Sequence, residues 1–185
     1  MKIILVLLAV TLFGLNASAQ VEDPSRFDIR IGIGTSLLGT GDMRTFMLET
    51  ELNYSLTEYF TIGGGLGMGR SNSGVSETAS FFQGNANMYF SPFGNSGKND
   101  FRIGGGLSFN SISDAYISSV ELGPGGQIIN QEVTFDQRNA LGFNIILENS
   151  YWITDKTLIG IKVFTQPYVN GDINSGILFK VGFRL

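Results

Sequence analysis

Apolar residues recur at every second position over most of this chain, up to its last residue, Leu185. A period of two predicts β-strands, because successive side chains of a strand point to opposite faces of a sheet. Stretches rich in glycine, asparagine, serine and aspartate separate the alternating segments and indicate turns or loops. We find eight such segments, at 27–33, 46–54, 60–68, 82–90, 101–109, 141–151, 157–165 and 177–185.

In every segment, the residues that share a face with the first position carry no charge. Charged residues make up 15% of the chain. An equal number of positions taken at random would therefore hold about six charges. No apolar stretch beyond residue 20 is long enough to cross a bilayer as a helix. Strands in hydrocarbon must close on themselves, because every backbone N–H and C=O group needs a partner. The pattern therefore predicts an all-β fold, an eight-stranded antiparallel up-and-down transmembrane β-barrel.

The opposite face carries the charges of these segments. They are Asp28, Arg30, Glu49, Glu51, Arg102, Glu148, Lys162, Lys180 and Arg184. A water-facing surface would be richer in lysine and glutamate and poorer in glycine, which weakens exposed strands. We therefore assign the charged face to the interior. The alternative is a soluble periplasmic lipocalin-like barrel that binds lipid, in which the same alternation is turned inside out.

Eight strands enclose a space that side chains just fill. Because an unpaired buried charge is costly, we expect the four acids of the interior face to pair with its five bases and to plug the barrel. The alternative is a small-solute channel. One feature favours a channel, the interior glycines Gly63, Gly65, Gly67 and Gly69 on a single strand.

The first residues of the chain form a different kind of segment. Lys2 precedes an apolar run at 3–15, and small residues follow at 17–19. This is the pattern of a secretory signal peptide over 1–19 that is cleaved before Gln20. The barrel domain then comprises 20–185, and we expect it in the outer membrane of a Gram-negative bacterium.

Three stretches resemble a known family: the glycine-rich segments 62–67 and 103–107, and the C-terminal segment 176–185. Together with the signal that ends in Ala-Ser-Ala-Gln, they look like the outer-membrane protein beta-barrel domain family common in Bacteroidetes. The resemblance covers the whole mature chain and implies a small barrel similar to OmpX and to the barrel domain of OmpA. Many such barrels end in an aromatic residue, whereas here Leu185 is last and Phe183 lies two positions before it.

The chain contains no histidine and no cysteine. Without them a serine nucleophile would need a lysine base, and the interior candidates Lys162 and Lys180 are expected to pair with acids instead. The segment 170–174 has a single carboxylate, which favours a turn over a calcium loop. A net charge of −4 without a basic cluster disfavours nucleic-acid binding. We therefore expect no catalytic residue, no metal and no cofactor.

The longest gap between segments, 111–139, contains two apolar stretches around a Gly-Pro-Gly-Gly turn signal at 123–126. We predict that the fifth and sixth strands continue beyond the membrane as an external hairpin; the alternative is a mobile loop. The residues that characterise the hairpin are Tyr116, Ile117, Val120, Leu122, Ile128, Ile129, Val133 and Phe135.

A protruding strand edge can capture a strand from another protein. The sequence thus predicts a monomeric, non-enzymatic barrel in contact with outer-membrane lipid. We expect it to act in envelope structure or in contact with a protein partner at its external loops.

Overall fold

The computed structural model describes residues 26–39, 43–71, 77–122 and 124–185. The predicted signal peptide, 1–19, lies outside the described residues. The strands are β1 (Phe27–Leu38), β2 (Met43–Ser55), β3 (Phe60–Ser71), β4 (Glu77–Phe90), β5 (Asn99–Leu122), β6 (Ile128–Trp152), β7 (Thr157–Pro167) and β8 (Ile173–Arg184).

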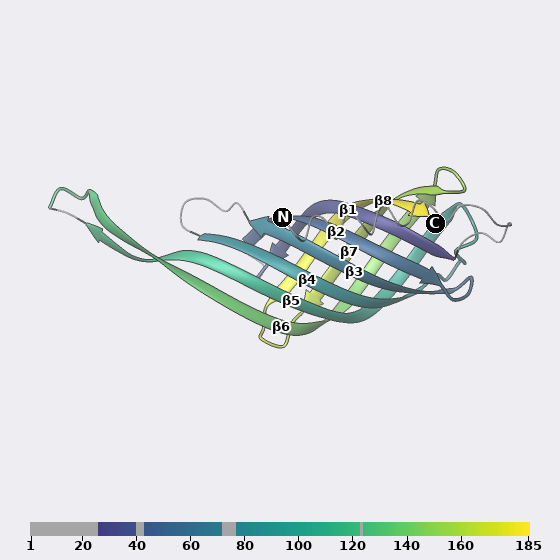
Figure 1. Ribbon diagram of the computed structural model, residues 1–185, viewed down its shortest axis with the longest axis horizontal. Helices are drawn as coiled ribbons and strands as arrows, with labels where there is room; N and C mark the ends of the chain where they lie inside the picture. Colours follow the sequence, from purple (N-terminus) through teal and green to yellow (C-terminus); the bar gives the residue numbers. More distant parts are fainter. Residues whose placement is uncertain (1–25, 40–42, 72–76, 123) are drawn as a thin grey trace.

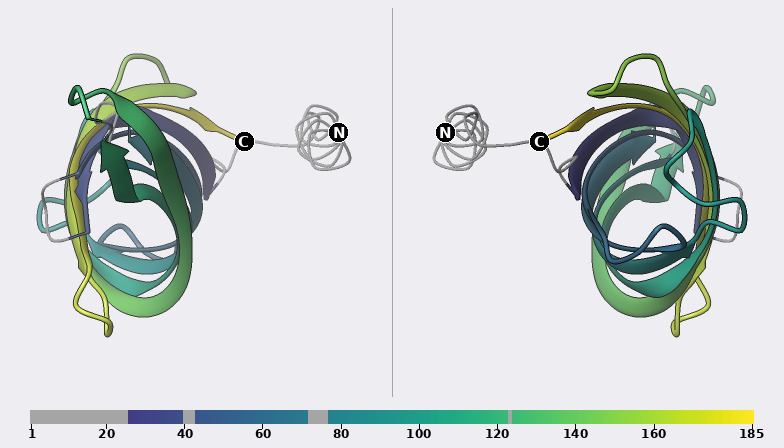
Figure 2. Two further views of the ribbon diagram at one scale, coloured as in Figure 1. Left: turned by 90° about the vertical axis from the view of Figure 1, so that its left-hand side faces the viewer. Right: turned by 90° about the vertical axis from the view of Figure 1, so that its right-hand side faces the viewer.

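Each strand pairs antiparallel with the next one along the chain, and β8 pairs with β1, so the sheet closes into a barrel. The ring of strands is seen end-on in Figure 2. Closure leaves each strand with two neighbours along its membrane-spanning part, which satisfies its backbone groups without water. The predicted fold, an eight-stranded antiparallel up-and-down barrel, is confirmed. Within the described ranges, no helix is long and apolar enough to cross a membrane.

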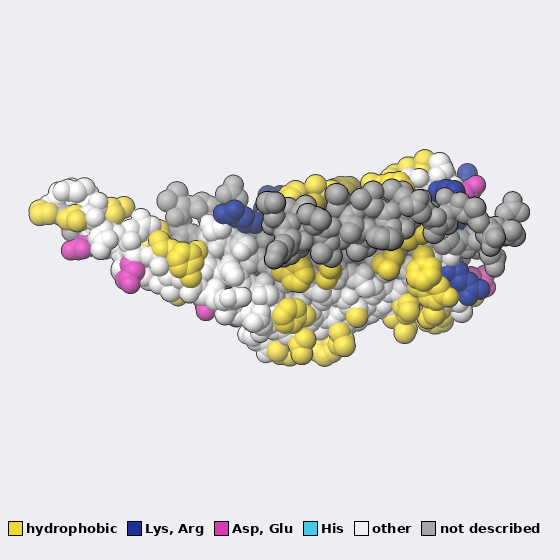
Figure 3. Space-filling model, in the orientation of Figure 1, with side chains coloured by type: hydrophobic (Ala, Val, Ile, Leu, Met, Phe, Trp, Pro, Cys, Tyr) yellow, Lys and Arg dark blue, Asp and Glu magenta, His cyan; other side chains and the backbone are white. Residues whose placement is uncertain are grey.

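Burial alternates along the strands with the predicted phase. In β2, buried and exposed positions follow one another from Met43 to Asn53. Large apolar side chains point outward and are exposed, for example Leu66 and Leu107 at 55% and 61%. Apolar side chains are exposed at several places on the visible barrel wall in Figure 3, while charged side chains lie near the ends and on the hairpin. A soluble barrel has the reverse arrangement, so the lipocalin-like alternative is wrong.

The short turns 56–59 and 153–156 lie at the same end of the barrel as Phe27 and the chain end, Leu185. Aromatic rings gather at this end: the Phe27 and Tyr54 ring centroids are 4.6 Å apart. Such a girdle is typical of a membrane interface, and short turns are typical of the periplasmic side.

At the opposite end, β5 and β6 run on as one hairpin that projects far beyond the other strands (Figure 1). The two strands have 24 and 25 residues and stay paired from Asn99 with Tyr151 up to Leu122 with Ile128. The described residues of 111–139 therefore form a paired hairpin, as predicted, with register shifts between Ile117 and Ser119 and between Glu121 and Leu122.

A polar row marks where the apolar belt ends below this hairpin. Arg70 of β3 lies opposite Ser80 of β4, Ser80 lies opposite Ser113 of β5, and Ser113 lies opposite Gln137 of β6. All four side chains face outward and are exposed. Apolar residues resume above the row, beginning with Phe135. The outward face thus has two apolar regions, the lipid-facing belt and a separate patch on the hairpin.

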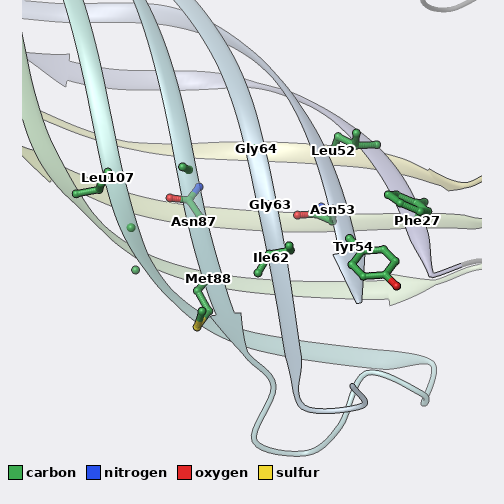
Figure 4. A pocket seen from close by; sticks show the side chains of 13 residues that line it. Phe27, Leu52, Asn53, Tyr54, Ile62, Gly63, Gly64, Asn87, Met88 and Leu107 are labelled. Carbon is green, nitrogen blue, oxygen red and sulfur yellow. The ribbon is translucent and has the colours of Figure 1, made fainter. Parts of the chain in front are cut away.

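The belt contains a groove of about 590 Å³ over β1 to β5 (Figure 4). Gly64 and Gly105 contribute no side chains to its floor, and Leu52, Met88 and Leu107 form its walls. A Cβ atom added at Gly64 would have no neighbour within 4 Å. The groove opens on the lipid-facing surface, where hydrocarbon chains have access to it.

Placing an arginine at two outward apolar positions tests where the membrane ends. Leu66→Arg should lower the free energy of unfolding by about 2–4 kcal/mol, because Leu66 lies in the belt. Phe135→Arg should change it by less than about 0.5 kcal/mol, because Phe135 lies above the polar row. Urea titrations in lipid vesicles, followed by the gel shift between folded and boiled protein, give both values. Equal losses would contradict the assigned boundary.

Candidate functional site

Two parts of the molecule are candidates for function, the barrel interior and the projecting hairpin. The interior holds eight of the nine charged residues predicted to face it, all buried. These are Asp28, Arg30, Glu49, Glu51, Arg102, Glu148, Lys162 and Lys180. They come from six strands and meet because alternate positions of a closed sheet converge on one axis.

Two lysines and three glutamates form the central cluster. Lys162 Nζ lies 2.7 Å from Glu49 Oε1 and 2.9 Å from Glu51 Oε2. Lys180 Nζ lies 3.1 Å from both Glu51 Oε2 and Glu148 Oε2. Each ammonium thus contacts at least two carboxylates, and each carboxylate at least one ammonium, which offsets part of the cost of burying the charges.

A second cluster lies next to the first, towards the periplasmic end. The Arg30 guanidinium donates to Asp28, 2.6 Å away, and also to Glu148, which links the two clusters. Arg102 donates to Asp100 at 2.5 Å. Sequence reasoning missed Asp100, because the apolar segment began at Phe101. The alternation already contained the signal, since Asp100 is two residues from Arg102 and shares its face.

Arg184, the ninth predicted interior charge, lies opposite Asp28 across β8 and β1, but its side chain joins neither cluster. Its guanidinium stacks over the Trp152 ring, 4.1 Å from the centroid. Among the described residues, no ion pair joins Arg184 to an acid of the interior. Arg184 is half-buried at the periplasmic end of β8, where the aromatic ring takes the place of a carboxylate.

An apolar layer covers the central cluster on its external side. On four strands, the inward-facing residue next to a cluster residue, on the side of the external end, is apolar and buried. The layer comprises Met47 next to Glu49, Ile146 next to Glu148, Phe164 next to Lys162 and Leu178 next to Lys180. The charges are therefore sealed from the outer mouth by packed side chains.

The interior glycines of β3 make room for large neighbours. A Cβ atom at Gly63 would collide with Asn53, one at Gly67 would crowd Gln83, and one at Gly69 would collide with Phe81. The glycine-rich face that favoured a channel is thus covered by side chains from adjacent strands.

A third charged group, which sequence reasoning missed, lies at the base of the hairpin. Arg138 of β6 pairs with Asp114 of β5 at 2.5 Å and with Asp172 of the β7–β8 loop at 2.8 Å. Burial alone would lower the pKa of Arg138, but the hydrogen bond to Asp172 and the charge of Asp114 raise it above its usual value. Arg138 therefore stays charged and ties the loop to the hairpin.

The predicted hairpin residues occupy both of its faces. Ile117 and Val133 lie opposite each other on the outward face, together with Val120, Ile129 and Phe135. Tyr116 lies on the other face, opposite Thr134. Leu122 and Ile128 pair at the tip. The outward face of the hairpin is thus the more apolar one, and Phe135 is 81% exposed.

The hairpin also has a free edge. β7 pairs with β6 only from Ile145 to Trp152, and a single bridge joins Gly142 to Tyr168. Within the described part of the chain, no strand lies against the outer edge of β6 over 128–140. A regular strand with one unpaired edge can accept another strand.

Solved structures with this architecture are outer-membrane proteins. Neisserial surface protein A has a TM-score of 0.65 at 15% identity, covering 89% of this chain and 100% of its own. Ail, the attachment invasion locus protein of Yersinia pestis, has a TM-score of 0.61 at 10% identity, covering 88% and 100%. OprG from Pseudomonas aeruginosa has a TM-score of 0.56 at 9% identity, covering 91% and 99%. No protein-family model and no curated protein matches the chain.

The chain has the fold of small outer-membrane β-barrels. A closed barrel with an apolar belt and a charged interior spans an outer membrane, because its exposed side chains match hydrocarbon and its edges are paired. The predicted location, the outer membrane of a Gram-negative bacterium, follows from this belt and this fold together.

Removing one cation from the central cluster should destabilise the barrel strongly. Lys162→Met leaves Glu49 and Glu51 with fewer partners, and we expect a loss of about 3–5 kcal/mol in the free energy of unfolding. Arg184→Met is the matched control and should cost at most about 1 kcal/mol, since it removes only the contact with Trp152. Urea titration with the gel-shift readout compares them. Similar losses would mean that the cluster does not contribute to stability.

Proposed function

We propose that this chain is a monomeric, non-enzymatic outer-membrane protein whose plugged barrel holds the β5–β6 hairpin as a pairing surface for an extracellular protein partner. One observation carries the proposal: a long, paired hairpin with a free strand edge projects beyond the other strands. The barrel supplies the anchor, and the hairpin supplies the contact.

The backbone direction along β6 supports strand pairing. The Leu141 carbonyl accepts a hydrogen bond from the Val169 N–H, 2.9 Å away, on the side that faces away from β5. Backbone groups of successive residues point to alternate edges of a strand. The odd-numbered residues of 131–139 therefore present their N–H and C=O groups to the free edge, where a partner strand can bind them.

The apolar patch above the polar row supports a protein as the partner. Phe135, Val133 and Ile129 are exposed on the hairpin, outside the lipid-facing belt. The opposite face of the hairpin carries Asp136 and Glu132. An extended segment that adds to the β6 edge would place alternate side chains beside the apolar residues of one face and the acidic residues of the other, as strand addition does in other complexes.

The charge clusters support a structural rather than a catalytic interior. Lys162 and Lys180, the interior candidates for a catalytic base, each contact two or more carboxylates. A lysine that must act as a base has to lose its proton, and neighbouring carboxylates oppose this. The same contacts make the barrel a firm base for the hairpin.

The names of two structural neighbours agree with a role at the cell surface. Ail is described as an attachment invasion locus protein, and NspA as a surface protein. We further infer that the chain belongs to the Bacteroidetes-type outer-membrane barrel family that its glycine-rich strands resemble.

The channel alternative predicts a different electrical behaviour. We expect purified protein in a planar lipid bilayer to show no steady open conductance, because the apolar layer at Met47 and Leu178 seals the charge cluster. The double variant Met47→Gly and Leu178→Gly serves as the control and should increase ion leakage. A steady conductance in the unaltered protein would favour the channel.

Site-specific photo-crosslinking on intact cells tests the hairpin. A photoreactive phenylalanine analogue at position 135 should form an adduct with an extracellular protein, whereas the same analogue at Leu66 should not. Gln131→Pro removes an edge N–H and should reduce the adduct about tenfold, because one backbone hydrogen bond to the partner strand is lost. Gln131→Ala, which keeps this N–H, should leave the adduct unchanged.

Two outcomes of this experiment would contradict the proposal. The first is an adduct that forms equally well with Gln131→Pro, since this would exclude pairing at the edge. The second is the absence of any adduct at position 135 when surface exposure of the hairpin has been verified by protease cleavage within 124–127.

A further inference from the structure

The hairpin carries its charges on a single face, the one that continues the barrel interior. We call it the acidic face, and its charged residues are Asp114, Glu121, Glu132, Asp136 and Arg138. Glu132 lies opposite Ser119, and Glu121 lies opposite Asn130. Directly opposite residues of an antiparallel pair point to the same side, and so do alternate residues of one strand. The register shift between Ile117 and Ser119 brings Glu121 onto this side.

Arg138 is the base of the acidic face, and three carboxylates share it. Its guanidinium lies 2.5 Å from Asp114, 3.5 Å from Asp136 and 2.8 Å from Asp172 of the β7–β8 loop. One positive charge against three negative ones leaves this group with a net charge of −2. The Oδ1 atom of Asp114 is buried, and within the described ranges it has no hydrogen-bond partner. Arg138 therefore balances these carboxylates only in part.

Glu121 and Glu132 lie further out on the hairpin, and both are exposed. Glu132 accepts a hydrogen bond from the Ser119 hydroxyl, 3.2 Å away, but this donor carries no charge. Among the residues that the structure describes, no cation pairs with either glutamate. Acidic side chains are visible along the hairpin in Figure 3. The free edge of β6 is therefore accompanied by negative charge that a partner can neutralise.

An antiparallel strand at the β6 edge would meet this charge at close range. The odd-numbered residues of 131–139 present their backbone groups to the edge, so Glu132 and Asp136 take the positions between the hydrogen-bonded pairs. The Cα atoms of two antiparallel strands are closest at such positions, about 4.5 Å apart. The residues opposite Glu132 and Asp136 are four positions apart in the added strand. The residues between them at odd spacing lie on the other face, beside Val133 and Phe135.

We propose that the segment bound at this edge is basic, with lysine or arginine at positions i and i+4 and apolar residues at i+1 and i+3. The two cations lie opposite Glu132 and Asp136 and form cross-strand ion pairs with them. The apolar residues lie next to Val133 and Phe135. Basic recognition of this kind rests on the proposed function, because it requires a strand at the β6 edge.

A second copy of the chain suits this edge less well. Two hairpins that pair along β6 would bring two acidic faces together, each with four acids and one arginine. Like charges on opposite strands are destabilising. A basic segment instead reduces the excess of negative charge, and the attraction between opposite charges also speeds the encounter.

Binding of four labelled peptides to the purified protein in nonionic detergent, followed by fluorescence anisotropy, tests the proposal. The basic peptide is Thr-Val-Lys-Val-Thr-Val-Lys-Val-Thr, and in two others glutamine or glutamate replaces both lysines. The fourth, Thr-Val-Val-Lys-Thr-Lys-Val-Val-Thr, has the composition of the basic peptide, but only one of its lysines can lie opposite an acid at a time. The basic peptide should bind about tenfold more tightly than the glutamine peptide, the rearranged peptide should be intermediate, and the glutamate peptide should bind most weakly.

Variants of the hairpin locate the binding charge. Glu132→Gln should weaken binding of the basic peptide about threefold and leave the glutamine peptide unchanged, because one ion pair is lost. The double variant Glu132→Lys and Asp136→Lys should reverse the preference, so that the glutamate peptide binds more tightly than the basic one. Glu58→Gln is the matched control: Glu58 is an exposed acid of the periplasmic turn 56–59, and its loss should leave binding unchanged. Every variant is first checked for the gel shift of the folded barrel.

Equal affinities of the basic and glutamine peptides would overturn the proposal, and so would equal losses for Glu132→Gln and Glu58→Gln. Gln131→Pro removes an edge N–H and should weaken all four peptides. If it does so while the basic and glutamine peptides bind equally, strand pairing stands and the basic partner is wrong. If Gln131→Pro leaves every affinity unchanged, pairing at the edge itself is contradicted. Self-association of the unaltered protein that Gln131→Pro abolishes would identify a second copy as the occupant and overturn the basic partner.

Discussion

Backbone hydrogen bonding in hydrocarbon is the constraint on which this structure depends. A strand inside a bilayer has no water to bind its N–H and C=O groups, so every membrane-spanning edge must have a neighbour. The pairing of β8 with β1 completes this requirement. Once the sheet is closed, each residue faces either lipid or the interior, and the two-residue period becomes a division between apolar and charged side chains.

The closed barrel also determines what the interior can hold. Charges from six strands converge on a narrow axis, and they are compatible with burial only because acids and bases contact one another. The glycines of β3 serve the same packing, since their missing side chains make space for Asn53, Gln83 and Phe81. The interior is therefore filled by side chains that hold the strands together across the lumen.

Above the membrane the constraint is relaxed, because water can satisfy an unpaired edge. β5 and β6 use this freedom and continue as a hairpin, while β4 and β7 end earlier. The outward face changes from apolar to polar and back to apolar along these strands. The polar row separates the lipid-facing belt from the upper apolar patch, and this patch suits a protein.

The sequence by itself determined the eight strands, their inward and outward faces, the closed barrel and the hairpin, because a period of two along each segment reports which medium each side chain meets. It did not reveal the ion pairs of Asp100 and Arg138, or that Arg184 contacts Trp152 instead of an interior acid. These contacts depend on where each strand starts and on which side chains meet across the lumen. The free edge of β6 and the polar row from Arg70 to Gln137 were likewise decided by the tertiary structure. Both arise from the register between strands, which local alternation does not contain.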